Sequence, residues 1–180
     1  MLAPLLAALD NRRSEFLAGL ASVPPEQRDR PPAAQAWSPL EIGEHLFRVE
    51  AGLARITTRQ IDKGADRRRV GEPSEKSVEG LIQALRTPAK MKMPAEVEKG
   101  IAPTGEITYA ELRERWHAAG EEWHAIAESL PPELEDEALV LHNVAGPLTT
   151  AQTLRFLEAH IEHHLHQLAR TVRALNASPA

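Results

Sequence analysis

The chain has 180 residues, of which 42% are hydrophobic, and a formal net charge of −5, so we expect a single domain over residues 1–180 with a core of its own. The absence of cysteine excludes disulfides, cysteine-ligated zinc sites, iron–sulfur clusters and thiol nucleophiles. The negative net charge argues against a nucleic-acid partner. The sequence contains no run of about 18 apolar residues, so we expect no membrane span.

The N-terminal segment predicts an amphipathic helix over residues 2–21, because leucines recur along it at helical spacing. This segment has neither the basic start nor the long apolar run of a signal peptide, so we expect a cytoplasmic protein. The next stretch, residues 23–35, contains four prolines and several charges and predicts a loop.

A second helix is predicted to begin at Ser38. Residues 38–41 spell Ser-Pro-Leu-Glu, which is a capping box with proline at the first helical position. Apolar residues then recur at helical spacing, and we expect the helix to end near Lys63, with Gly64 just beyond it. The stripe is formed by Ile42, Leu46, Val49, Leu53 and Ile56.

Residues 65–107 are the least regular part of the chain and contain four prolines. We expect a short helix over about residues 77–86 and a long crossover connection around it, of the kind that is often functional or wraps the domain. The arginines at 67–69 predict a solvated loop in preference to a phosphate site. Met91 and Met93 are candidates for the mouth of a pocket or for ordinary surface packing.

Two further helices are predicted at residues 108–130 and 149–176, each opening with a capping box. The first carries a heptad stripe in which Trp116 and Trp123 should be core residues. The second follows a predicted turn at residues 146–147. No segment predicts a strand of useful length, so we expect an all-α protein, a four-helix bundle with a long crossover connection.

Four of the eight histidines lie within residues 160–166. An α-helix turns about 100° per residue, which places His164 about 50° and His160 about 90° from the centre of the apolar stripe. His163 and His166 lie about 150° away, on the predicted solvent side. The cluster therefore divides into an inward pair, one helical turn apart, and an outward pair.

The remaining histidines can be sorted in the same way. His45 lies about 60° from the centre of its stripe, again on the inner flank. His117 and His124 are more than about 100° from theirs and should face water. The orientation of His142, in the loop before the last helix, stays open.

These angles select His45, His160 and His164 as candidate metal ligands. Imidazole suits zinc, nickel, copper and iron(II), and three protein ligands leave a position open for water or substrate, as catalytic sites do. Such an ion can activate bound water or polarise a substrate. The alternative is that these histidines are boundary residues with ordinary hydrogen bonds, because a pair four residues apart also occurs by chance.

Two stretches of the chain resemble the DinB/YfiT-like superfamily. Residues 37–46 read WSPLEIGEHL, similar to the entry to that family's second helix. Residues 160–168 read HIEHHLHQL, similar to its last helix, where a histidine is followed by a histidine pair and then glutamine. His142 is followed by Asn143, where relatives often have His-Pro, and this departure should change only the turn.

The resemblance implies a four-helix bundle, often a homodimer, with a divalent metal, commonly nickel or zinc, held by histidines that match His45, His160 and His164. His163 matches a position that is often histidine without being a ligand. The family includes thiol-dependent S-transferases, isomerases and hydrolases, so the resemblance implies a small-molecule substrate and a low-molecular-weight thiol as co-substrate. The alternative is a non-catalytic, stress-related binding protein that retains the bundle.

Residues next to the candidate ligands have two interpretations each. Gln167 could orient a ligand histidine or form an interhelical hydrogen bond. Trp37 could form a wall of the metal site or a hydrophobic staple onto the second helix. Glu41 has its capping role and Glu44 is predicted to point to solvent, so no catalytic base is assigned. No Gly-rich phosphate loop, serine-hydrolase elbow or paired di-iron motif is present.

Overall fold

The computed structural model describes residues 2–87 and 100–177 and is mostly helical, which confirms the all-α class. In chain order the helices are α1 (Ala3–Ala21), α2 (Pro25–Arg28), α3 (Pro39–Asp62), α4 (Glu75–Arg86), α6 (Tyr109–Ser129) and α7 (Thr150–Ala177). Short 3₁₀ turns, η1 (Gly64–Asp66) and η2 (Pro132–Leu134), follow α3 and α6. A hairpin of β1 (Val140–His142) and β2 (Gly146–Leu148) precedes α7. None of the helices described is long and apolar enough to cross a membrane.

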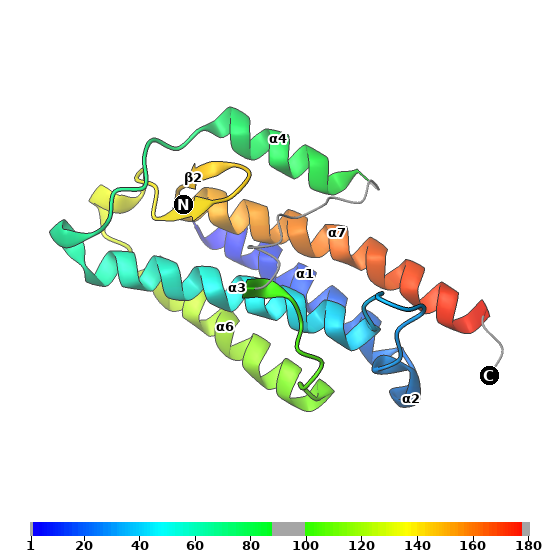
Figure 1. Ribbon diagram of the computed structural model, residues 1–180. Coiled ribbons are helices and arrows are strands. Elements are labelled where there is room, and N and C mark those ends of the chain that lie inside the picture. The colour runs from blue at the N-terminus through cyan, green and yellow to red at the C-terminus, as the bar shows by residue number, and fades with distance from the viewer. Residues whose placement is uncertain (1, 88–99, 178–180) are drawn as a thin grey trace.

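The direction of the long helices explains the long connection between α3 and α6. Helices α3 and α6 pack side by side and run in the same direction, opposite to α1 and α7 (Figure 1). The chain must therefore return along the length of α3 before α6 can begin. On this return path α4 packs on the outside of α7, while α7 also contacts α1 and α3.

The predicted capping boxes define where three long helices begin. Ser38 Oγ accepts from the Glu41 amide at 3.2 Å, and the Glu41 carboxylate accepts from the Ser38 amide at 2.7 Å. Equivalent reciprocal pairs begin α6 and α7, and they are Thr108 with Glu111 and Thr149 with Gln152. Each box satisfies amides that the first helical turn leaves without a partner.

Three local predictions were wrong or incomplete. The predicted loop at residues 23–35 contains the single turn α2. Residues 146–147 lie in β2 and not in a turn, since Gly146 pairs with His142 and Pro147 with Leu141. Three-residue strands are too short to give a sequence periodicity. Arg68 and Arg69 are exposed as expected, but Arg67 is half-buried and bonds the Gly64 carbonyl and Glu137. Met91 and Met93 lie outside the described residues.

The core contains a buried ion pair that the sequence pattern did not predict. Trp116 and Trp123 are fully buried, as predicted. The Glu50 carboxylate accepts from Arg13 Nη2 and from Trp116 Nε1, each at 2.6 Å, and Arg13 Nη1 bonds Asp10 at 2.6 Å. Burial raises the pKa of the Glu50 carboxyl despite the adjacent guanidinium. This network ties α1, α3 and α6 together.

Two glycines of α3 offer a matched test of the packing. A Cβ at Gly43 would lie 2.7 Å from Leu112 Cδ2 and 3.3 Å from Phe16 Cε1, whereas a Cβ at Gly52 would meet nothing within 4 Å. Gly43→Ala is therefore expected to lower the free energy of unfolding by about 1–3 kcal/mol. Gly52→Ala should raise it by about 0.5–1 kcal/mol, because alanine loses less backbone entropy in a helix. Urea denaturation followed by circular dichroism measures both, and equal effects would contradict the close approach of α3 to α6.

Candidate metal centre

The structure brings the three predicted ligands together between α3 and α7. His45 lies in the second turn of α3, and His160 and His164 lie on successive turns of α7. The Nε2 atom of His160 is 3.3 Å from that of His45 and 3.1 Å from that of His164. All three side chains are buried, with exposed fractions of 1%, 6% and 8% in chain order. Their ligand atoms lie within 4.8 Å of one another.

Hydrogen bonds at the far side of two rings fix which nitrogen faces the centre. His45 Nδ1 donates to the Ile101 carbonyl at 3.0 Å, and His164 Nδ1 donates to Gln167 Oε1 at 2.7 Å. Since both acceptors are oxygens without a hydrogen, each ring carries its proton on Nδ1. The lone pairs on Nε2 then point inward. An acceptor of this kind behind a ligand histidine is the usual arrangement at protein metal sites.

The spacing of the donors fits a transition-metal ion. Ligand bonds of about 2.0–2.1 Å to imidazole nitrogen place two such nitrogens about 3.0–3.4 Å apart. The two closest Nε2 separations, 3.1 and 3.3 Å, fall in that range. Among the residues described, His160 Nδ1 has no hydrogen-bond partner, so no acceptor there fixes its ring. The convergence of neutral nitrogen donors is the chemistry that zinc, nickel and similar ions prefer.

Burial keeps the three rings in the form that binds metal. Burial lowers the pKa of His45, although its bond to Ile101 opposes the shift. It lowers the pKa of His160 and of His164 well below the ordinary value, and repulsion between neighbouring imidazoliums adds to the effect. A protonated imidazole has no lone pair to give to a metal, so these shifts favour the ligating state.

Aromatic side chains surround the trio. The Trp37 ring centroid lies 4.9 Å from that of His45 and 6.4 Å from that of His164. Phe156 stacks on His160 with centroids 5.3 Å apart, and its other neighbour is His142 at 4.6 Å. Of the two interpretations of Trp37, the structure therefore supports the one in which its ring forms a wall of this site. Of the two interpretations of Gln167, the structure supports the orientation of a candidate ligand, because Gln167 Oε1 accepts from His164 Nδ1.

The sequence predicted that Glu44 points to solvent, and this prediction is wrong. Its side chain is buried, and its oxygens accept from the backbone amide and hydroxyl of Thr104 and from the amide of Gly105. Burial raises the pKa of the Glu44 carboxyl, but these hydrogen bonds and that from Arg48 outweigh it and hold the pKa below its ordinary value. The prediction failed because residues 102–107 cover this side of α3, which helical geometry alone cannot show.

The other histidines divide as follows. His117 and His166 are exposed, as predicted, and His124 is partly exposed and bonds Asp10 at 2.9 Å. His163 was predicted to face solvent, but it is half-buried and its Nδ1 donates to the Leu85 carbonyl at 2.7 Å. The cause is α4, which covers that face of α7.

His142, whose orientation the sequence left open, lies at the end of β1, and its Nδ1 accepts from the amides of Val144 and Ala145. Sequence reasoning missed Phe156 and the Ile101 carbonyl. Phe156 was identifiable only as an apolar residue one helical turn before His160 on the same helix. A backbone carbonyl such as that of Ile101 leaves no signal in the sequence at all.

Comparison with known proteins identifies the family of the chain. The family model described as DinB superfamily matches residues 8–168, which include all three histidines. Searches of curated proteins and of solved structures gave no match. A family match over this much of the chain, together with the two motifs that it contains, establishes that the chain belongs to the DinB superfamily.

Proposed function

We propose that this DinB-superfamily protein binds one divalent transition-metal ion through His45, His160 and His164. The observation that carries the proposal is the convergence of three buried Nε2 atoms, two pairs of them at 3.1 and 3.3 Å. The donor set favours zinc or nickel, since both accept imidazole nitrogen. Two of the three rings already have the outer hydrogen bond that ligand histidines use.

We further propose that the bound ion serves a metal-dependent enzyme of the thiol S-transferase or hydrolase type. Three protein ligands leave a coordination position for a substrate, and an ion held in this way acts as a Lewis acid. The substrate is expected to be a small molecule, with a low-molecular-weight thiol as co-substrate in the transferase case. Trp37 packs against the ring of His45, and Phe156 packs against the ring of His160. No residue is assigned as a catalytic base.

The proposal for the whole chain is a single-domain four-helix bundle with a long crossover. It is supported by the packing of α7 on α1 and α3, and of α3 on α6. The homodimer and the cytoplasmic location stay predictions.

Activity is tested on metal-loaded and metal-stripped protein with a panel of thiols, each paired with electrophiles, and with ester and amide substrates. The enzyme proposal expects turnover that requires the metal and is lost in His45→Ala. Full metal occupancy with no turnover across the panel would contradict the enzyme proposal and favour a non-catalytic binding protein.

Gln167→Leu tests the metal site without removing a ligand. The substitution removes the acceptor behind His164, and it is expected to weaken metal binding about 10–100-fold, the usual cost of losing such a partner. His166→Ala is the control, because this exposed histidine lies on the same helix and should leave the affinity unchanged. Zinc competition titration with a chromophoric chelator measures both, and equal affinities for the two variants would contradict the role of Gln167.

A further inference from the structure

The ring of His45 depends on a segment far away in the sequence. Its Nδ1 donates to the carbonyl of Ile101, which is the last helical residue before a bend at Ala102. From there the chain runs without regular secondary structure over residues 103–108 to the start of α6. In Figure 1 this green segment passes across the front of α3 and continues to the start of α6. An acceptor on an irregular segment can orient a ligand only if the segment itself is held in place.

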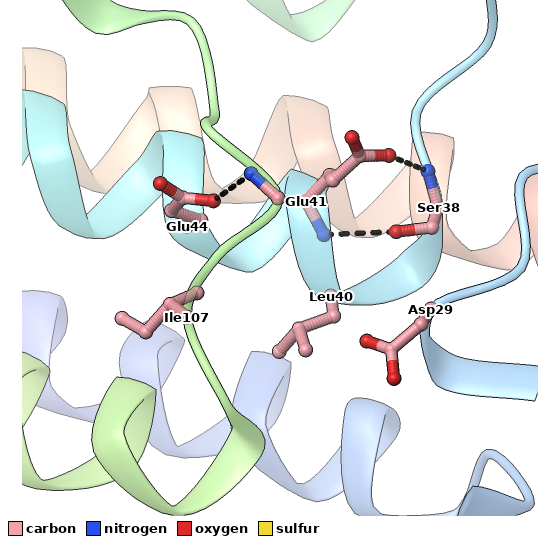
Figure 2. A pocket seen from close by; sticks show the side chains of 7 residues that line it. Asp29, Ser38, Leu40, Glu41, Glu44 and Ile107 are labelled. Carbon is pink, nitrogen blue, oxygen red and sulfur yellow. Dashed lines mark hydrogen bonds between the residues drawn. The ribbon is translucent and has the colours of Figure 1, made fainter. Parts of the chain in front are cut away.

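The neighbour of His45 supplies that attachment. One oxygen of Glu44 accepts from the Thr104 amide at 2.9 Å and from the Thr104 hydroxyl at 2.8 Å. The other oxygen accepts from the Gly105 amide at 3.0 Å. Figure 2 shows the Glu44 carboxylate bonded to the chain that continues to Ile107, beside the capping pair of Ser38 and Glu41.

The geometry of this attachment is specific. Glu44 has an exposed fraction of only 3%, so its carboxylate forms hydrogen bonds to these donors and to Arg48 in place of water. Gly105 has a φ of +72°, a backbone conformation that few other residues adopt and that turns its amide towards Glu44. Hydrogen bonds to an ionised carboxylate are about twice as strong as those between neutral groups. Residues 101–105 are therefore bonded to two consecutive residues of α3.

We propose that Glu44 is a positioning residue for the metal centre, and that it fixes residues 101–105 so that the Ile101 carbonyl sets the tautomer and orientation of the ligand His45. This inference rests on the proposed metal site. It assigns to Glu44 an effect on the metal that acts wholly through the backbone of another segment.

The first test is Co²⁺ binding, because the visible spectrum of Co²⁺ reports its coordination geometry. Glu44→Ala is expected to raise the Kd about 10–100-fold, as losing a ligand's orienting partner does, and to change the visible bands. Glu44→Gln keeps one acceptor oxygen but turns an amide NH₂ group towards the donor on the other side, so its Kd and its spectrum should lie between those of the wild type and Glu44→Ala. Thr104→Val removes one donor from an exposed residue, keeps the fold intact, and should raise the Kd by a smaller factor.

Glu41→Ala is the matched control. It removes a carboxylate from the same end of α3 and opens the capping box, but it does not touch residues 101–105 through a hydrogen bond. Its Co²⁺ spectrum and Kd should equal those of the wild type even though its stability falls. If Glu44→Ala also retains the wild-type Kd and spectrum, the positioning role is wrong while the metal site stands.

The second test needs no metal and uses nitrogen NMR of the histidine rings. The wild-type apoprotein should show His45 with its proton on Nδ1, because the Ile101 carbonyl requires a donor there. Glu44→Ala should shift His45 towards a mixture of tautomers, and Glu41→Ala should not. An unchanged tautomer in Glu44→Ala would overturn the inference. Wild-type protein that binds no Co²⁺ would instead overturn the proposed metal site, so the two failures are distinguishable.

Discussion

Glu50→Gln is expected to lower the free energy of unfolding by about 2–3 kcal/mol. This is less than the roughly 3–5 kcal/mol for a buried charge left with no partner, because Arg13 keeps its bond to Asp10. The glutamine has nearly the same shape, but it removes the charge opposite Arg13. Glutamine has only one acceptor oxygen, so its NH₂ group would face one of the two donors that Glu50 now satisfies. These donors are Arg13 Nη2 and Trp116 Nε1. Urea denaturation followed by circular dichroism measures the loss, which is a large fraction of the stability of an ordinary domain.

Arg115→Met is the control for this prediction. Arg115 also pairs with a glutamate, Glu111, but on the exposed face of α6, and removing such a pair should leave the free energy of unfolding nearly unchanged. The double variant Arg13→Met with Glu50→Met should be more stable than Glu50→Gln, because neither charge of the buried pair remains. A loss below about 1 kcal/mol in Glu50→Gln would contradict the burial of the Arg13–Glu50 pair away from water.

His160→Ala is expected to remove the stabilisation that a metal gives. A ligand that binds only the folded state adds about 2.7 kcal/mol at a free concentration 100 times its Kd. Wild-type protein should gain stability of this order when zinc is added, and His160→Ala should gain none, since its nitrogen lies between the other two. Thermal unfolding with zinc and with a chelator measures the difference.

His166→Ala serves as the comparison, because it removes a histidine of the same sequence cluster that is exposed. It should respond to zinc like the wild type. If His160→Ala responds to zinc as strongly as His166→Ala does, the ion binds somewhere other than the three buried histidines.

The parts of the fold that the sequence predicted are those that local rules control. Capping boxes begin three of the long helices where the sequence placed them, and proline or glycine follows near the predicted ends. Helical geometry alone also selected His45, His160 and His164, because a residue's angle from the apolar stripe measures how close it lies to the neighbouring helix. The structure confirms that these three lie together.

The parts that the sequence could not predict depend on which segment covers a helix face. Glu44 and His163 both lie on faces that helical geometry assigns to solvent, and both are covered, by residues 102–107 and by α4. Arg13 and Glu50 are 37 residues apart in the chain, and their pairing could be predicted only by knowing that α1 packs beside α3. A single sequence contains no signal for such long-range contacts.

Elemental analysis of purified protein without a histidine tag would show whether His45, His160 and His164 hold a metal ion. We expect about one zinc, nickel or similar ion per chain in the wild type and none in His164→Ala, whose folding is verified by circular dichroism. Wild-type protein that holds no metal, even after reconstitution at a pH where imidazole is neutral, would contradict the assignment of these histidines as a metal centre.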